Sequence, residues 1–166
     1  MVKIYVDSAD LKQMREAAKN PLIKGFTTNP TLMRKAGVKD YRAFAREAIN
    51  EFKDFPISLE VFSDDFLGME TQAREIASWG ENVYVKIPVT NTKGESSGEL
   101  VARLTYSGIK VNVTAVMTRD QIEEIADSLW KDTPAIISVF AGRIADTGRN
   151  PVSTVNHALL RRRQPY

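Results

Sequence analysis

The sequence contains no cysteine and a single histidine among its 166 residues. Without thiols there is no disulfide and no thiolate metal site, and His157 alone cannot form a zinc site. We therefore expect neither a metal nor another cofactor. His157 falls within a predicted helix, where a structural role is the more common one.

The sequence also lacks an excess of charge of one sign and any long hydrophobic run. Its 23 basic residues nearly balance 21 acidic residues, and apart from Arg161, Arg162 and Arg163 the basic residues are dispersed. This pattern indicates no nucleic-acid or membrane-binding surface. No stretch of about 18 apolar residues and no leader pattern occurs. We expect a cytoplasmic protein whose partner is a small molecule.

What the sequence does contain is an alternation of short β-branched runs with longer segments of helical periodicity. With 43% hydrophobic residues the chain can form a real core, and this alternation is typical of a parallel α/β sheet covered by helices. Helix caps are expected at Ser8 or Asp10, Asp40, Asp64 and Thr118, and Pro151 suits a first helical position. The predicted strands are 3–6, 25–27, 57–62, 83–87, 110–116 and 135–140, and the predicted helices are 10–19, 41–52, 64–79, 97–106, 118–130 and 151–162.

The strongest chemical signal is Lys86 in the strand Val83 to Ile87. Because strand side chains alternate, Val83, Val85 and Ile87 face one way and Lys86 the other. In a strand covered on both sides this buries the amine, which favours its neutral form, and a neutral amine can attack a carbonyl. The alternative is an exposed or ion-paired lysine.

Other polar residues occur at equivalent places, the carboxyl ends of predicted strands, where ligands collect in barrels and open sheets. Asp7 closes the first predicted strand and Glu60 interrupts the third, although each could instead be a helix cap or a solvated carboxylate. Asn112 and Thr114 share one face of a strand, where a buried structural network is the alternative.

Two further segments follow strands. Residues 27–30, Thr-Thr-Asn-Pro, come after the second strand and could form an Asx or Ser/Thr turn that enters a helix. Arg143 follows the sixth strand and could offer its guanidinium to a phosphate, although a surface salt bridge is the ordinary role of an isolated arginine.

Taken in order, these residues resemble the transaldolase family, specifically its shorter members related to fructose-6-phosphate aldolase. The similarity extends from Met1 to about His157. It is carried by the segments 6–9 (VDSA), 25–32 (GFTTNPTL), 59–61 (LEV), 85–88 (VKIP), 112–116 (NVTAV) and 138–144 (SVFAGRI).

The resemblance implies a (β/α)8 TIM barrel of the class I aldolase type that works without a metal. Lys86 matches the lysine that forms a Schiff base with a ketose phosphate. Glu60 and Thr114 match the pair that holds a catalytic water, and Asp7 matches the acid/base for the C4 hydroxyl. The residues that match substrate-binding positions are Asn29, Asn112, Ser138 and Phe140 beside the dihydroxyacetone unit and Arg143 at the phosphate.

Two positions bear on the reaction that the resemblance implies. This chain has Glu60 where the aldolase branch has Gln, and Phe140 where that branch has Tyr. Both favour transfer of a dihydroxyacetone unit between sugar phosphates, as in the pentose phosphate pathway, over its release as a free product. The alternatives are a fructose-6-phosphate aldolase, or a non-catalytic barrel that acts as a binding or oligomerisation module.

The resemblance ends before the two last strands and helices of such a barrel. We expect residues 1–166 to form one (β/α)-barrel domain with about six of eight units, incomplete at its C-terminus. Such a domain would leave a parallel sheet edge uncovered. The resemblance also implies a homo-oligomer.

Overall fold

The computed structural model describes residues 2–161, which form strands and helices in alternation. The strands are β1 (Ile4–Asp7), β2 (Ile23–Thr27), β3 (Ile57–Glu60), β4 (Val83–Pro88), β5 (Val111–Val116) and β6 (Ala135–Val139). The helices are α1 (Leu11–Ala18), α2 (Pro30–Lys35), α3 (Tyr41–Glu51), α4 (Phe66–Ala77), α5 (Gly98–Tyr106), α6 (Arg119–Ser128), α7 (Ala141–Asp146) and α8 (Val152–Arg161).

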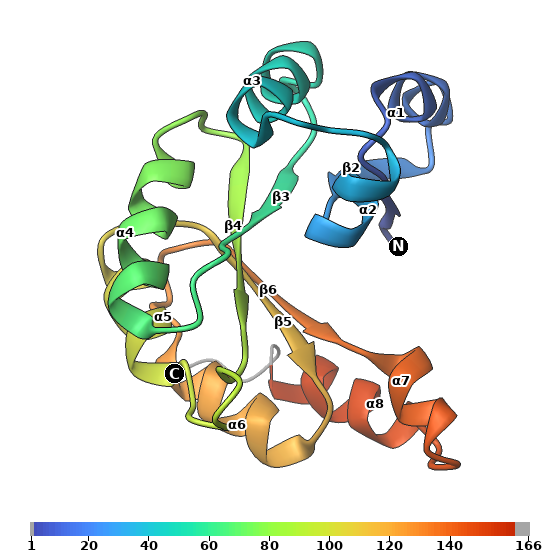
Figure 1. Cartoon of the computed structure of the whole chain (residues 1–166). Helices are drawn as coiled ribbons and strands as arrows, with labels where there is room; N and C mark the ends of the chain where they lie inside the picture. The colour runs from blue at the N-terminus through green and yellow to red at the C-terminus, as the bar shows by residue number, and fades with distance from the viewer. Residues whose placement is uncertain (1, 162–166) are drawn as a thin grey trace.

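The strands form a single parallel sheet in which sequence order and spatial order are the same, β1-β2-β3-β4-β5-β6. The sheet curls, and helices α3, α4, α5 and α6 follow one another around its outer side (Figure 1). This is part of a (β/α) barrel, with six of the eight strands that a closed TIM barrel contains. The predicted fold class is confirmed. Within residues 2–161, β1 and β6 are the edge strands.

Three of the four predicted helix caps are confirmed. Asp10, Asp40 and Thr118 accept backbone N–H groups in the first turns of α1, α3 and α6, as predicted. For α4 the prediction of Asp64 was wrong, because the cap is Asp65, which accepts the N–H of Gly68 at 2.7 Å. The carboxylate of Asp64 instead accepts hydrogen bonds from the backbone N–H and the hydroxyl of Thr92.

Two helices were not predicted. Helices α2 and α7 contain six residues each, which is too short for a helical period to emerge from the sequence. Four strands also end one or two residues away from the predicted position, since β1 ends at Asp7, β3 at Glu60, β4 at Pro88 and β6 at Val139. The last predicted helix, 151–162, corresponds to α8 (Val152–Arg161). Its predicted final residue, Arg162, lies outside the described residues.

The core lies between the outer face of the sheet and the helices. Val83, Val85 and Ile87 are at most 4% exposed and face this layer, as alternation along β4 predicts. Burial of each such side chain contributes about 1.5–3 kcal/mol. None of the helices formed by residues 2–161 has the length and apolar character needed to cross a membrane.

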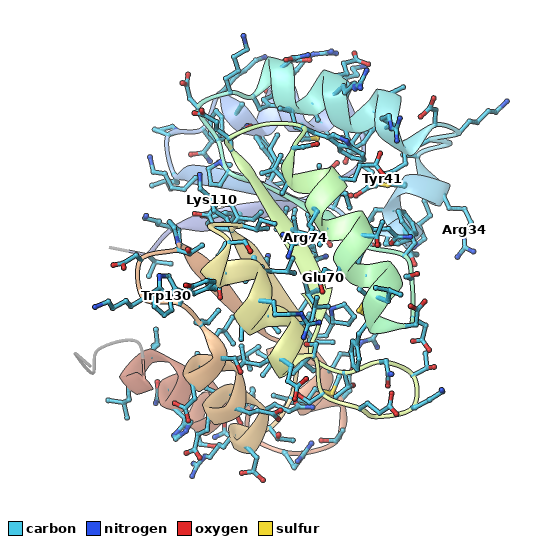
Figure 2. The ribbon with its side chains drawn as sticks, turned by 90° about the vertical axis from the view of Figure 1, so that its left-hand side faces the viewer. Arg34, Tyr41, Glu70, Arg74, Lys110 and Trp130 are labelled. Atoms are coloured by element: carbon cyan, nitrogen blue, oxygen red, sulfur yellow. The ribbon has the colours of Figure 1, made fainter. Side chains whose placement is uncertain are left out.

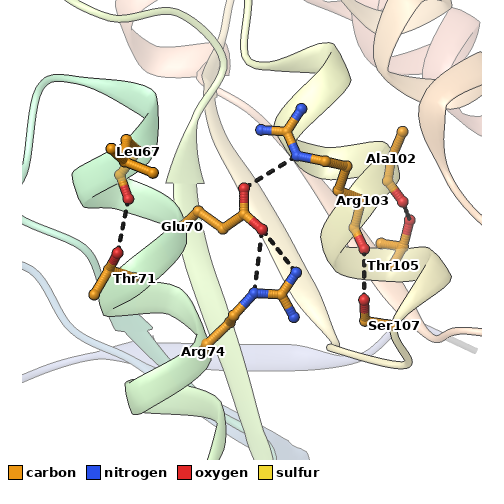
Figure 3. Close-up of polar contacts among 8 residues, drawn as sticks. All are labelled: Leu67, Glu70, Thr71, Arg74, Ala102, Arg103, Thr105 and Ser107. Carbon is orange, nitrogen blue, oxygen red and sulfur yellow. Dashed lines mark hydrogen bonds and ion pairs between the residues drawn. The ribbon is translucent and has the colours of Figure 1, made fainter.

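Ion pairs link successive helices across the outer surface. Arg15 on α1 contacts Glu51 on α3, and Arg42 on α3 contacts Glu75 on α4. Glu70 of α4 lies between Arg74 of its own helix and Arg103 of α5 (Figure 3). Figure 2 shows Glu70 and Arg74 on the helical side of the sheet, whereas Arg34 extends away from the ribbon.

Candidate functional site

The side chain of Lys86 lies near the carboxyl end of β4 and is only 8% exposed. Its Nζ donates to the backbone oxygen of Thr28 at 2.8 Å and lies 3.3 Å from Oε2 of Glu60. Glu60 is the register partner of Lys86 on the neighbouring strand. The side chain is buried, as expected, and its amine contacts a carboxylate rather than apolar groups alone.

The turn between β2 and α2 connects Lys86 with Asp7. Thr27 donates its hydroxyl to Oδ1 of Asp7 at 2.8 Å, and Asn29 donates its amide to Oδ2 at 3.2 Å. The oxygen of Asn29 accepts the N–H of Leu32 and so caps α2. Thr28 lies between these two residues, and its backbone oxygen accepts from Lys86. Residues 27–29 thus bind Asp7 through two side chains and Lys86 through one backbone oxygen.

Asn112 occupies the centre of a buried hydrogen-bonded chain. Its Nδ2 donates to Oγ of Ser58 at 3.1 Å, and its Oδ1 accepts from Oγ of Ser138 at 2.7 Å. Both partners are hydroxyls, which can donate or accept, and they hold the amide between β3 and β6. Asn112, Ser138 and Ser58 therefore lie together.

Thr114 is 4% exposed and lies beside a bulge in β5. The register shifts between Val113 and Val116, and Ala115 within the bulge has φ 62°. A non-glycine residue in this region is strained by about 1–3 kcal/mol, and such strain is concentrated at functional sites. The bulge shapes the end of β5 directly after Asn112 and Thr114.

Phe140 and Arg143 lie farther out. Phe140 is 36% exposed and precedes α7. The side chain of Arg143 is 73% exposed and lies 3.5 Å from Asp146. The structure therefore brings Lys86 and Glu60 into direct contact, ties both Asp7 and Lys86 to the β2–α2 turn, and leaves Arg143 on the surface.

Sequence reasoning missed three residues that shape the site. Ser58 is a hydroxyl within an otherwise apolar stretch of β3, a signal that could have drawn attention to it. Thr27 was noted only as part of a turn. Tyr41 gave no local signal, yet its hydroxyl donates to the backbone oxygen of Glu60 at 3.0 Å. Burial, and then the nearby Glu60 carboxylate, raise the pKa of the Tyr41 hydroxyl well above its usual value, so it remains a donor.

Two hollows on the surface lie away from Lys86. One of about 510 Å³ lies among α6, α7 and α8, and another of about 430 Å³ lies beside α2 and is lined by Tyr41 and Phe62. Lys86 lines neither hollow. The candidate site is identified by the contacts of Lys86, Glu60 and Asp7. Within residues 2–161 no cluster of three or more His, Cys, Asp or Glu side chains is arranged to hold a metal ion.

The parallel, curled sheet with alternating helices is part of a (β/α) barrel, and the buried lysine and its carboxylate lie at the carboxyl edge of the strands, where the active sites of such barrels are found. The family model described as Transaldolase/Fructose-6-phosphate aldolase matches residues 4–163. The chain belongs to this family.

Several proteins with similar sequences are named probable transaldolases. A "Probable transaldolase" of Dehalococcoides mccartyi is 31% identical over 157 residues, which cover 93% of this chain and 68% of the relative. Those of Roseiflexus castenholzii and Streptococcus agalactiae serotype V are 39% and 36% identical over 154 residues, covering 93% of this chain and 67% of each relative. The chain thus matches about two thirds of the length of these relatives.

Proposed function

We propose that this protein transfers a dihydroxyacetone unit between sugar phosphates, as in the pentose phosphate pathway, through a Schiff base on Lys86. The observation that carries the proposal is the buried Lys86 amine, 2.8 Å from the Thr28 oxygen and 3.3 Å from Glu60. Family membership supports the reaction class.

Formation of the Schiff base needs proton transfers that the neighbours of Lys86 can supply. The amine attacks the ketone carbon of the donor to give a carbinolamine, which loses water to form an iminium. Glu60 is close enough to take a proton from the amine and, with Thr114 and a water, to return one to the departing hydroxyl. The hydrogen bond from Tyr41 holds the backbone of Glu60, from which this carboxylate extends.

Cleavage of the C3–C4 bond needs a base at the C4 hydroxyl. The iminium withdraws the electron pair of the breaking bond, and the three-carbon unit stays on Lys86 as an enamine. We assign the base to Asp7, whose two oxygens are oriented by Thr27 and Asn29. Asn112 and Ser138 would hold the hydroxyl groups of the bound unit.

The fate of the enamine separates transfer from simple cleavage. In transfer, the enamine attacks an acceptor aldehyde, whose oxygen takes the proton held by Asp7, and hydrolysis then frees Lys86. Phe140 favours this outcome, because a phenyl ring has no hydroxyl with which to protonate or orient a water. A fructose-6-phosphate aldolase would instead release free dihydroxyacetone.

A second candidate is a non-catalytic module that binds another chain. The observation that favours it is the pair of edge strands within the described residues, β1 and β6. Ile4 of β1 is 43% exposed, and Phe140, directly after β6, is 36% exposed. An unpaired strand edge is a template for pairing with another chain.

One assay separates these candidates. The purified chain is incubated with fructose 6-phosphate, with and without erythrose 4-phosphate. A transaldolase releases at most about one equivalent of glyceraldehyde 3-phosphate per chain without the acceptor, and many equivalents when the acceptor is present. Free dihydroxyacetone without an acceptor would identify an aldolase, and no product in either mixture from a cooperatively folded chain would support the non-catalytic module.

A further inference from the structure

The chain segments that leave β3 and β4 make a second contact beyond the Lys86–Glu60 pair. The last hydrogen bond between the two strands runs from the N–H of Val61 to the backbone oxygen of Lys86 at 3.2 Å. Farther on, Asp64 in the β3–α4 connection accepts the backbone N–H of Thr92 at 2.8 Å and its hydroxyl at 2.6 Å. Thr92 belongs to the β4–α5 connection. Both carboxylate oxygens of Asp64 therefore bind one residue of the neighbouring connection.

The two hydrogen bonds to Asp64 have a charged acceptor. The hydroxyl and then the N–H of Thr92 lower the pKa of the Asp64 carboxyl below its usual value, partly offset by burial and aided by Lys93. A hydrogen bond to an ionised carboxylate is stronger than one between neutral groups. Within residues 2–161 no other hydrogen bond joins the β3–α4 connection to the β4–α5 connection.

The β4–α5 connection is tied to the end of β4, so Thr92 does not move independently of that strand. Asn91 is only 9% exposed; its Oδ1 accepts the N–H of Glu95, and its own N–H donates to the backbone oxygen of Glu95, each at 3.0 Å. Ser97 donates its N–H and its hydroxyl to the backbone oxygen of Val89, directly after β4, at 3.0 and 3.1 Å.

The β3–α4 connection is held in the same way on the other side of the contact. Oε1 of Gln72 on α4 accepts the N–H groups of Phe62 and Ser63 at 2.7 and 3.0 Å. Asp65 caps α4. Because Asp64 lies between these fixed residues, its carboxylate links one ordered connection to another.

We propose that Asp64 and Thr92 are positioning residues, which clamp the ends of β3 and β4 and so keep the Lys86 amine against the Glu60 carboxylate. Strand ends open more easily than strand centres, and both side chains extend from strand ends. The clamp touches neither reacting atom. Its consequence for turnover rests on the proposed function, whereas its effect on Lys86 can be measured without a sugar.

Reductive methylation with formaldehyde and cyanoborohydride measures how freely Lys86 is reached, and peptide mass spectrometry locates the product. In the wild type, Lys86 is 8% exposed and should react more slowly than the exposed Lys12. Asp64→Ala should raise the rate at Lys86 at least about threefold, because it removes two hydrogen bonds. Thr92→Ser keeps both hydrogen bonds and should match the wild type, and Thr92→Val, which loses the hydroxyl, should react faster than Thr92→Ser.

Thr118→Ala is the matched control for a general loss of stability. It removes the side-chain cap of α6 and destabilises the chain without touching the clamp, so Lys86 should be modified at the wild-type rate. Should Asp64→Ala not fold, the comparison of Thr92→Val with Thr92→Ser carries the test. A wild-type rate at Lys86 in folded variants that lack the clamp, or the same acceleration in Thr118→Ala, overturns the proposal.

Steady-state kinetics measures the consequence for turnover. A displaced amine should lower kcat by about tenfold in Asp64→Ala with a smaller change in KM, and Thr92→Ser should keep the wild-type kcat. A wild-type kcat in a folded Asp64→Ala variant would also overturn the positioning role. If the wild type neither turns over nor forms an adduct on Lys86, the proposed function fails, and the methylation rates alone decide whether the clamp positions Lys86.

Discussion

Nζ of Lys86 lies 3.3 Å from a carboxylate oxygen of Glu60, its register partner on the adjacent strand. The two side chains therefore meet because β3 and β4 pair in this register, and a slip by one residue would turn one of them to the helical layer. The backbone of the sheet, rather than a flexible loop, positions the proposed amine and its carboxylate.

Replacing the Glu60 carboxylate by an amide should slow the reaction. Glu60→Gln keeps the size of the side chain but removes the base, and general acid–base groups contribute about 10²–10⁴-fold. Steady-state kinetics should therefore show kcat reduced by at least about 10²-fold with a smaller change in KM. Glu70→Gln, which removes a carboxylate from the outer surface, serves as the control and should leave kcat unchanged. Equal kcat for Glu60→Gln and wild type would remove Glu60 from the mechanism.

The buried hydroxyl of Thr28 should cost stability. Thr28 is 0% exposed, and its Oγ1 has no partner within the described residues. An unsatisfied buried hydroxyl costs about 1–3 kcal/mol, so Thr28→Val should raise the melting temperature by about 2–4 °C or more. Thr28→Ser retains the hydroxyl and loses a methyl group, so its melting temperature should fall. Calorimetry that finds Thr28→Val less stable than wild type would show that the hydroxyl is satisfied.

Removing the Tyr41 hydroxyl should affect both stability and turnover. Tyr41→Phe preserves the ring contacts with Phe62 and Trp79, whose ring centroids lie 4.9 and 5.6 Å from that of Tyr41, but it loses the hydrogen bond to the Glu60 backbone. We expect a loss of about 1 kcal/mol in the free energy of unfolding and a reduced kcat. Urea denaturation and kinetics measure the two effects, and Tyr106→Phe, on the exposed face of α5, is the matched control. An unchanged kcat in a folded Tyr41→Phe variant would argue against a positioning role.

Glu70 should make stability depend on pH. Hydrogen bonds from Arg74, opposed in part by burial and aided by Arg103, lower the pKa of the Glu70 carboxyl (Figure 3). Since the folded-state pKa lies below the unfolded one, the contribution is present above about pH 4.3 and is lost as the pH falls through the folded value. For this partly exposed network we expect about 0.5 kcal/mol.

The measurement is urea denaturation of wild type and Glu70→Gln at pH 7 and at pH values below 4. The difference in unfolding free energy should be largest at pH 7 and shrink on acidification. A difference that stays constant, or grows as the pH falls, would contradict the assignment.

The sequence predicted the parts of this fold that depend on patterns within one element. The alternation in β4 correctly buried Val83, Val85 and Ile87 on one side with Lys86 on the other. The cap of α4 was misplaced because Asp64 and Asp65 are both capable, and the choice depends on Thr92, 28 residues away. Likewise, the contact of Lys86 with the Thr28 backbone joins residues 58 positions apart, and no local pattern reports it.

The sequence drew attention to individual residues of the candidate site but not to the contacts between them. Asp7, Glu60 and Asn112 were recognised as polar residues near the carboxyl ends of strands. Ser58 and Tyr41 were missed because their roles arise only when strands and helices pack. Arg143 was expected at a phosphate, and its assignment to that role stays a prediction, since its side chain is 73% exposed beside Asp146.

Reductive trapping shows whether Lys86 forms a Schiff base with the donor. Borohydride added during incubation with fructose 6-phosphate or dihydroxyacetone should convert an iminium on Lys86 into a stable secondary amine, which peptide mass spectrometry locates. We expect a three-carbon adduct on Lys86, none on the exposed Lys12 and none in Lys86→Ala. Wild-type protein in which Lys86 carries no adduct, or in which label is spread over surface lysines, would contradict it.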